Sequence, residues 1–337
     1  MGVKLGEIVP KEEISWDLLK GKTLAVDASN VFYQFVSSIR QPDGTPLSDS
    51  RGRVTSHLVG LFSRIPNLIG KGIKLCFVFD GKAPELKKRE RERRHTLKVR
   101  AAEKYEEAKE REDIEAMGKY ARQVSMINSD MIEEAKELIK ALGIPVVQAP
   151  SEAEAQAAYM CRKKDVWAVA SQDYDALLHR APRVVMNLTL SQRKRLPSGG
   201  YVKVTPELVE FNKLLDKLEI TDDQLIVLAI LVGTDYNVKG VKGIGPKKAL
   251  QLVQSGKSFD EIFSSLDVKF DWKEIFDLFK NMPVTDDYKI EFGDIDEQKI
   301  KEILVEEHDF SKERVESTLK KLKEYMNPEQ TGLNKWF

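Results

Sequence analysis

Seven carboxylates stand just after apolar segments or at the start of helical ones: Asp27, Asp80, Glu152, Glu154, Asp173, Asp175 and Asp235. Each has a structural explanation when it is taken alone. Asp27 is a suitable helix cap, and the spacing of Ser151 and Glu154 fits a capping box. Asp173 and Asp175 suit a turn. If all seven meet, however, they repel one another, and several stay protonated unless cations neutralise them.

The segments around these acids predict how they are positioned. Strands are expected over residues 23–26, 73–79, 144–147 and 166–170. Helices are expected over residues 31–39, 56–69, 131–142 and 153–163. Strands that are apolar on both faces and alternate with helices indicate an α/β fold, with a mostly parallel central sheet and helices on both faces. Ligands of such sheets bind beyond the carboxyl ends of the strands, where most of these acids stand.

A cluster of this kind predicts a site for divalent cations. Oxygen ligands without His or Cys nearby suit two Mg²⁺ ions, with Mn²⁺ as an alternative, rather than zinc. Two such ions would supply four positive charges against the seven negative ones of the site. A two-metal carboxylate site can activate a water, stabilise a leaving oxygen and clamp a phosphate between the ions. The predicted reaction is therefore phosphodiester hydrolysis.

A strongly basic segment interrupts the alternation of strands and helices. Residues 82–100 contain nine Lys or Arg against three Glu, and few large apolar residues separate them. Such a helical segment cannot belong to the core, so we expect an insertion that projects from the sheet beside Asp80. Its positive charge would attract a polyanion to an acidic site.

A second basic feature combines glycine and lysine within residues 240–249. Gly243 and Gly245 allow main-chain amides to approach phosphate oxygens, and the helix that follows presents its N-terminus. Lys242, Lys247 and Lys248 would add affinity that does not depend on sequence. The alternative is a glycine-rich loop with solvated lysines. A run of this length that opens an amphipathic helix favours the turn of a DNA-binding helix–turn–helix element.

Composition excludes a membrane protein and a zinc-finger protein. The 337 residues hold 54 Lys+Arg and 54 Asp+Glu, so net charge alone says nothing about nucleic acid. No apolar run approaches the roughly 20 residues of a membrane helix. Cys76 and Cys161 stand alone, without the paired ligands of a zinc site. We therefore expect an intracellular protein with no membrane association. Given the predicted attraction for a polyanion, we further expect it to be located with the DNA, and to be a monomer.

The ordered set of motifs resembles the archaeal-type flap endonucleases of the structure-specific 5′-nuclease superfamily. The resemblance runs from the first residues to the last. It rests on Val26-Asp27-Ala28-Ser29, Val78-Phe79-Asp80-Gly81-Lys82, Ala149-Pro150-Ser151-Glu152-Ala153-Glu154-Ala155, Ser171-Gln172-Asp173-Tyr174-Asp175 and Gly233-Thr234-Asp235-Tyr236. The glycine-lysine segment follows in the expected place. Asn30 and Ser171-Gln172 differ from common relatives without removing a carboxylate.

The resemblance implies a Mg²⁺-dependent enzyme that removes 5′ flaps, and cleaves 5′ ends exonucleolytically, in replication and repair. It also implies that the basic insertion forms a gateway or arch for the 5′ strand. Lys87 and Arg94 match positions that reach the scissile phosphate from this arch, and Tyr33 matches one that stacks on a base near the cut. The glycine-lysine hairpin of the family also holds a monovalent cation against the duplex.

The C-terminal residues suggest a binding peptide. Gln330, Leu333, Trp336 and Phe337 follow Pro328, which should end the last helix near Tyr325. A tail with three large apolar side chains either folds back onto its own domain or binds a partner. The pattern of Gln, Leu and two aromatics resembles the peptide by which replication enzymes bind the sliding clamp (PCNA).

The predicted organisation is one nuclease domain over residues 1–326, with the arch at about 82–130 and the helix–turn–helix element at about 222–256. Residues 327–337 form a flexible clamp-binding tail. Three other functions compete with a flap nuclease. A non-catalytic, clamp-tethered DNA-binding scaffold leaves the seven acids unexplained. A small-molecule phosphohydrolase has no use for the hairpin, and an RNA-directed nuclease of related fold is disfavoured only by the family resemblance.

Overall fold

The structure is a computed structural model that carries no ligands. It describes residues 2–41, 43–111, 113, 116, 119–120, 127–188, 193–195 and 201–326. The predicted tail, with Gln330, Leu333, Trp336 and Phe337, lies outside the described residues. The predicted arch at about 82–130 is described over 82–111, 113, 116, 119–120 and 127–130. The prediction that this segment forms a complete arch therefore also lies outside the described residues.

A seven-stranded sheet forms the centre of the molecule, in the order β1-β9-β6-β5-β2-β3-β4. Its strands are β1 (Glu12–Glu13), β2 (Thr23–Asp27), β3 (Lys74–Phe79), β4 (Val146–Gln148), β5 (Ala168–Ala170), β6 (Arg183–Met186) and β9 (Glu207–Glu210). Strands β4, β3, β2, β5 and β6 run parallel, while β9 pairs antiparallel with both β6 and β1. The predicted mostly parallel α/β sheet is confirmed. Strands β1, β6 and β9, and the separate hairpin of β7 (Arg193–Arg195) and β8 (Tyr201–Lys203), were not predicted.

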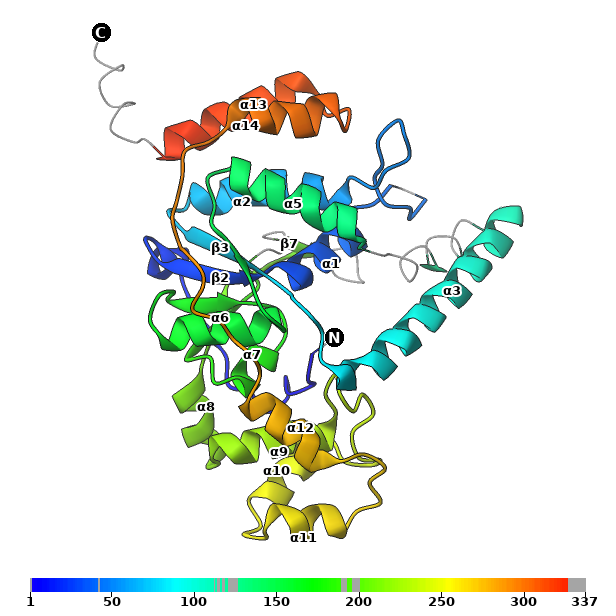
Figure 1. Cartoon of the computed structure of the whole chain (residues 1–337), viewed down its shortest axis with the longest axis vertical. Helices are drawn as coiled ribbons and strands as arrows, with labels where there is room; N and C mark the ends of the chain where they lie inside the picture. The colour runs from blue at the N-terminus through cyan, green and yellow to red at the C-terminus, as the bar shows by residue number, and fades with distance from the viewer. Residues whose placement is uncertain are drawn as a thin grey trace.

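Both faces of the sheet are buried, because alternate residues of each strand enter different halves of the core. In β2, Leu24 and Val26 belong to one apolar cluster and Ala25 to the other. The first face is covered by α1 (Ala28–Ser38), α2 (Ser56–Ile69), α5 (Ser129–Ala141), α13 (Glu297–Lys301) and α14 (Lys312–Met326). The second is covered by α6 (Ala153–Arg162), α7 (Asp175–Leu178), α8 (Phe211–Leu218) and α9 (Asp222–Val232). Figure 1 shows the chain returning at its end to the α2 and α5 side.

Beyond the sheet, the second half of the chain is helical. Helix α9 is buried along nearly its whole length and packs against α10 (Pro246–Val253). Helices α11 (Phe259–Ser264) and α12 (Trp272–Lys280) complete this end of the molecule (Figure 1). The α9–loop–α10 unit coincides with the segment predicted as a helix–turn–helix element, whose role in DNA binding stays a prediction.

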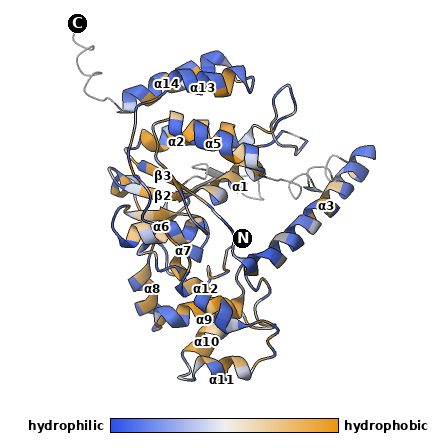
Figure 2. Cartoon of the chain, in the orientation of Figure 1, coloured by the Kyte–Doolittle hydropathy of each residue, from blue (hydrophilic) through white to orange (hydrophobic). Residues whose placement is uncertain are grey.

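Helix α3 (Lys88–Glu110) projects away from the body of the protein and follows the short 3-10 turn η2 (Glu85–Lys87). Figure 2 shows α3 as almost uniformly hydrophilic, as expected for a segment outside the core. Among its described side chains, only Glu90, Ala101 and Ala108 are buried. Among the described residues, no helix has the length and apolar character needed to cross a membrane.

Candidate active site

The carboxyl edge of the parallel strands brings the acidic residues together. Asp27 is the last residue of β2 and caps α1, because its Oδ1 accepts a hydrogen bond from the Asn30 amide at 3.1 Å. Asp80 directly follows β3, and Asp173 follows β5. Helix α6 starts after Glu152 and carries Glu154 in its first turn, while Asp175 opens α7. Asp235 lies just beyond the end of α9.

All seven predicted acids border one cavity system. A cavity of about 540 Å³ is lined by Asp27, Asp80, Glu152, Glu154, Asp173 and Asp235. Asp175 lines a small adjoining cavity together with Glu152, Glu154 and Asp235. The predicted convergence of the carboxylates is therefore present, although their role as metal ligands stays a prediction.

The electrostatics of this cavity are unusual for an acidic cluster. Burial, followed by repulsion from Asp80, raises the pKa of Asp27 to about 8. Burial, together with the nearby Asp173 and Asp235, raises the pKa of Asp175 to about 7. The pKa of Glu154 is raised well above its usual range, again first by burial and then by Asp175. The positive charge within the site is therefore too small to balance all of its carboxylates.

Hydrogen bonds fix several of these carboxylates. Asp80 accepts from the Ser29 hydroxyl at 2.5 Å and from the Ala153 amide at 2.8 Å. The Asn30 side-chain amide donates to Asp173 at 2.9 Å. The sequence marks Asn30 only as a departure from relatives, although its position in the first turn of α1, directly after β2, was a usable signal.

Gly2 packs directly against the site and was missed as a functional residue. A Cβ atom at this position would lie 2.5 Å from Asp173 Cβ and 2.6 Å from Asp175 Oδ2. The next residue, Val3, donates its amide to Asp175 Oδ1 at 3.0 Å. The N-terminal segment thus needs glycine for close approach, and nothing in the sequence pattern around Gly2 indicates this contact.

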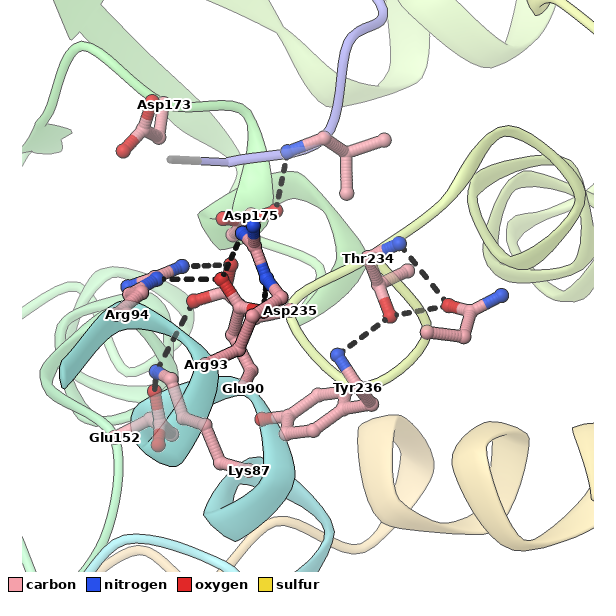
Figure 3. Close-up of polar contacts among 12 residues, drawn as sticks. Lys87, Glu90, Arg93, Arg94, Glu152, Asp173, Asp175, Thr234, Asp235 and Tyr236 are labelled. Atoms are coloured by element: carbon pink, nitrogen blue, oxygen red, sulfur yellow. Dashed lines mark hydrogen bonds and ion pairs between the residues drawn. The ribbon is translucent and has the colours of Figure 1, made fainter. Parts of the chain in front are cut away.

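Two basic side chains reach into the cavity from the base of the projecting helix (Figure 3). Lys87 Nζ lies 2.5 Å from Glu152 and 3.5 Å from Asp235, while an Arg94 terminal amine lies 2.6 Å from Asp235. Burial would lower the pKa of Lys87, but attraction to Glu152 and Glu154 outweighs burial and raises it. Only Arg94 belongs to α3, because Lys87 ends the preceding 3-10 turn.

The seven acids offer oxygen donors with too little positive charge around them, which suits hard divalent cations. The expectation of no His nearby was wrong, because His179 lines the adjoining cavity with Glu152, Glu154, Asp175 and Asp235. In the arrangement that the structure shows, no three Asp, Glu, His or Cys side chains among the described residues are grouped to hold a metal ion. Lys87 and Arg94 instead pair with Glu152 and Asp235. These two basic residues are the internal counter-ions of the site.

The rim of the cavity is partly apolar. The Tyr33 side chain lines it with 53% of the residue exposed, and Leu97 and Ile127 line it as well. An exposed aromatic ring beside an acidic cavity offers a surface on which a nucleobase can stack.

The predicted hairpin covers the end of the loop between α9 and α10, the same loop that carries Asp235, and the first turn of α10, which holds Lys247 and Lys248. Lys242, Lys247 and Lys248 are exposed. Gly243 adopts a φ of 78°, a conformation that favours glycine. Gly245 immediately precedes α10, and a Cβ at either glycine would meet no atom within 4 Å. The loop backbone is thus open to a ligand on this side.

Comparison with known proteins identifies the family. The XPG N-terminal domain matches residues 1–101 and the XPG I-region matches residues 143–235. Flap endonuclease 1 of Staphylothermus marinus is 49% identical over 349 residues, which cover 100% of both chains. Flap endonuclease 1 of Pyrococcus furiosus is 50% identical over 340 residues, covering 100% of this chain and 99% of the relative. The chain belongs to the flap endonuclease 1 family.

Solved structures agree with membership of the flap endonuclease 1 family. The flap endonuclease-1 from Methanococcus jannaschii has a TM-score of 0.78 at 44% identity, covering 97% of this chain and 99% of that one. The catalytic core of Rad2 in complex with DNA substrate has a TM-score of 0.67 at 23% identity, covering 94% and 97% of the two chains. The second similarity shows that the fold is shared beyond flap endonucleases.

Proposed function

We propose that this member of the flap endonuclease 1 family, a structure-specific nuclease for 5′ flaps, hydrolyses the phosphodiester bond at the carboxylate cavity with two bound Mg²⁺ ions. Nucleases of this family are generally metal-dependent. The observation that carries the proposal is the convergence of seven carboxylates on one cavity system, bordered by two cationic side chains. Among these acids, Asp27, Glu154 and Asp175 have raised pKa values.

The metal ligands in this proposal are Asp27, Asp80, Glu152, Glu154, Asp173, Asp175 and Asp235. Bound divalent ions would supply an activated water and charge stabilisation for the leaving oxygen. The protein side chains do the positioning. Asn30 orients Asp173, Ser29 and the Ala153 amide orient Asp80, and the Val3 amide orients Asp175.

Lys87 and Arg94 have two successive roles in this account. Without metal they neutralise Glu152 and Asp235. Cation binding to those carboxylates would release both basic groups toward the phosphate, where they stabilise charge that develops in the transition state. The 2.5 Å contact of Lys87 with Glu152 supports this exchange, because one oxygen cannot serve both partners well.

Binding of the branched DNA is distributed over three surfaces. Tyr33 would stack on a base beside the cut, and the basic face of α3 would form the arch over the 5′ strand. Lys242, Lys247 and Lys248, with the Gly243 and Gly245 backbone, would contact the duplex backbone, where a monovalent cation can bridge protein and phosphate. The support is the exposure of these lysines and their place: Lys242 lies in the loop that also carries Asp235, and Lys247 and Lys248 lie in the first turn of α10 directly after it.

Two further proposals rest on sequence. The tail would bind the sliding clamp through Gln330, Leu333, Trp336 and Phe337, and the enzyme would act as a monomer. Deletion of residues 330–337 should abolish clamp binding in calorimetry. Cleavage without clamp should stay unchanged. Loss of clamp-free activity or thermal stability on deletion would show a tail folded back on its own domain.

The function is tested by one comparison of substrates. We expect Mg²⁺-dependent cleavage of a DNA with a 5′ flap, with little cleavage of the same strand unbranched or of an RNA equivalent. Binding of flap DNA without cleavage in any divalent metal would favour a DNA-binding scaffold. Preferential cleavage of the RNA form would favour an RNA-directed nuclease.

A further inference from the structure

Glu90 is the one charged residue of α3 that is buried among the described side chains of that helix. Only 4% of it is exposed, although it stands in the first turn of a helix that projects from the body. A carboxylate that loses its water needs charged or hydrogen-bonding partners to offset the loss. The groups that contact Glu90 therefore indicate its role.

Those partners are two neighbouring arginines on the same helix (Figure 3). Glu90 Oε2 accepts a hydrogen bond from Arg93 Nε at 2.6 Å, and Oε1 accepts one from an Arg93 terminal amine at 2.8 Å. Oε1 also accepts from Arg94 Nε at 2.7 Å. Charge-assisted bonds of this number hold the planar guanidinium groups in fixed orientations.

Arg94 is held at both ends as a result. Its Nε is fixed by Glu90, and its terminal amine lies 2.6 Å from Asp235 at the floor of the cavity. Arginine is long and flexible, so a group that fixes Nε limits the directions in which the terminal amines can point. Both Arg93 and Arg94 line the cavity.

We propose that Glu90 is a positioning residue for the reaction: it holds the Arg94 guanidinium so that its terminal amines face the phosphate site. This inference rests on the proposed function of Arg94 at the scissile phosphate. If Asp235 binds a metal ion, its contact with Arg94 would weaken, and Glu90 would be the described contact that keeps Arg94 oriented.

A purely structural role for Glu90 makes a different prediction. Spacings of three and four residues to Arg93 and Arg94 stabilise any helix, and an acid in the first turn interacts favourably with the helix dipole. Loss of helix stability would disturb the whole arch, including Lys87 and the bound strand. Electrostatics gives a third expectation: removing a negative charge beside a polyanion should tighten binding without slowing the reaction.

The test separates binding from the chemical step. Flap DNA affinity is measured with Ca²⁺ in place of Mg²⁺, and the single-turnover rate is measured with excess enzyme. For Glu90→Ala we expect affinity equal to wild type or tighter, and a rate at least about tenfold lower. Glu90→Gln retains one carbonyl acceptor, so its single-turnover rate should fall between those of the wild type and Glu90→Ala. Glu92→Ala is the matched control, because it removes the same charge from an exposed position of α3.

A double-mutant cycle decides the mechanism. If Glu90 acts through Arg94, Glu90→Ala should slow the Arg94→Ala variant no further. Additive losses, weaker DNA binding, or a rate for Glu90→Ala equal to that of Glu92→Ala would overturn the proposal while leaving the nuclease assignment intact. A wild-type rate for Arg94→Ala would remove the proposed role of Arg94 and the inference with it. Metal-dependent flap cleavage by the wild type tests the function independently.

Discussion

The carboxylate cavity differs from a second group of ionisable side chains, built around the buried Asp49, His57 and His308, which we term the histidine cluster. It consists of Asp49, Arg53, His57, Glu134 and His308. Asp49 and Arg53 belong to the loop before α2, His57 to α2, Glu134 to α5, and His308 to the turn before α14. The histidine cluster thus ties the loop before α2 to the C-terminal helices.

Acids in the histidine cluster have partners for their charge. Burial would raise the pKa of Asp49, but hydrogen bonds from the Arg53 amide, its guanidinium and His308 outweigh burial and lower the pKa to about 2. The neighbouring His57, whose Nε2 is 3.6 Å from Glu134, lowers the pKa of that acid. In the cavity, by contrast, the pKa values of Asp27, Glu154 and Asp175 are raised.

The difference shows how a structural acid is told from a functional one. Asp49 receives two backbone amides and two side chains, so its charge stabilises the fold. Asp27 receives one amide from α1 and faces other carboxylates. An arrangement that leaves buried acids in conflict costs stability, and it is typical of a site that a ligand completes, which here would be the proposed divalent cations.

The largest expected effect is on cleavage. Asp175→Asn should lower the single-turnover rate by about 10³-fold or more, since it removes a proposed metal ligand. Flap binding should change little or tighten, because a negative charge is lost near a polyanion. Asp49→Asn, the same substitution in the histidine cluster, should cleave at the wild-type rate per folded molecule. Equal losses in both variants would end the distinction between the two clusters.

Removing the charge of an acid should raise stability in the carboxylate cavity and lower it in the histidine cluster. In chelator at pH 7, Asp27→Asn should raise the free energy of unfolding by on the order of 2 kcal/mol, because one pKa unit corresponds to about 1.4 kcal/mol. Asparagine also keeps the cap of α1. Asp49→Asn should lower the urea midpoint, because a charged acceptor is lost. Shifts in the same direction for both variants would contradict the comparison.

The pH dependence of stability sharpens the same contrast. The pKa of Asp49 is lowered in the folded protein. Its contribution to the free energy of unfolding is therefore present above about pH 4 and is lost as pH falls through about 2. The pKa of Asp27 is raised, so in metal-free protein its contribution is present below about pH 4 and is lost as pH rises through about 8. Urea unfolding of chelator-treated protein from pH 5 to 8 should show falling stability, with a shallower fall in Asp27→Asn. A fall of equal slope in both proteins would refute the assignment to Asp27.

The smallest expected effect concerns the duplex surface. Replacement of Lys242, Lys247 and Lys248 by Ala should reduce the slope of log affinity against log salt by up to about 2.7, at about 0.9 per phosphate contact. Replacement of the exposed Lys312, Lys320 and Lys321 of α14 is the charge-matched control. A slope that changes equally in both triple variants would place the duplex elsewhere.

Sequence alone could predict the parallel centre of the fold. Strands β2 and β3 are buried on both faces and end at Asp27 and Asp80, so their apolar runs and the acids after them are visible in the chain. The antiparallel edge was not predictable in the same way. Its pairing of Glu12 with Leu208 joins two short segments far apart in sequence, and neither has a long apolar run.

The candidate site shows the same limit. Carboxylates that follow strands could be found because topology forces them together. The role of Gly2 could not be found in this way, since it depends on packing of the N-terminal segment against Asp173. Glu90 reads as one more charge on a basic helix, and only its burial against Arg93 and Arg94 distinguishes it from Glu92.

The central claim is that divalent cations would balance the negative charge of the acids in the cavity. Proton release on metal binding tests this claim most directly. At pH 7 the raised pKa of Asp27 keeps a proton that a metal ion would expel. Calorimetric titration of Mn²⁺ into chelator-treated protein, in buffers of different ionisation enthalpy, measures the protons released per ion bound. We predict two Mn²⁺ per chain with release of at least about one proton, less in Asp27→Asn and unchanged in Asp49→Asn. Mn²⁺ binding without proton release, or release lost equally in both variants, would contradict the account.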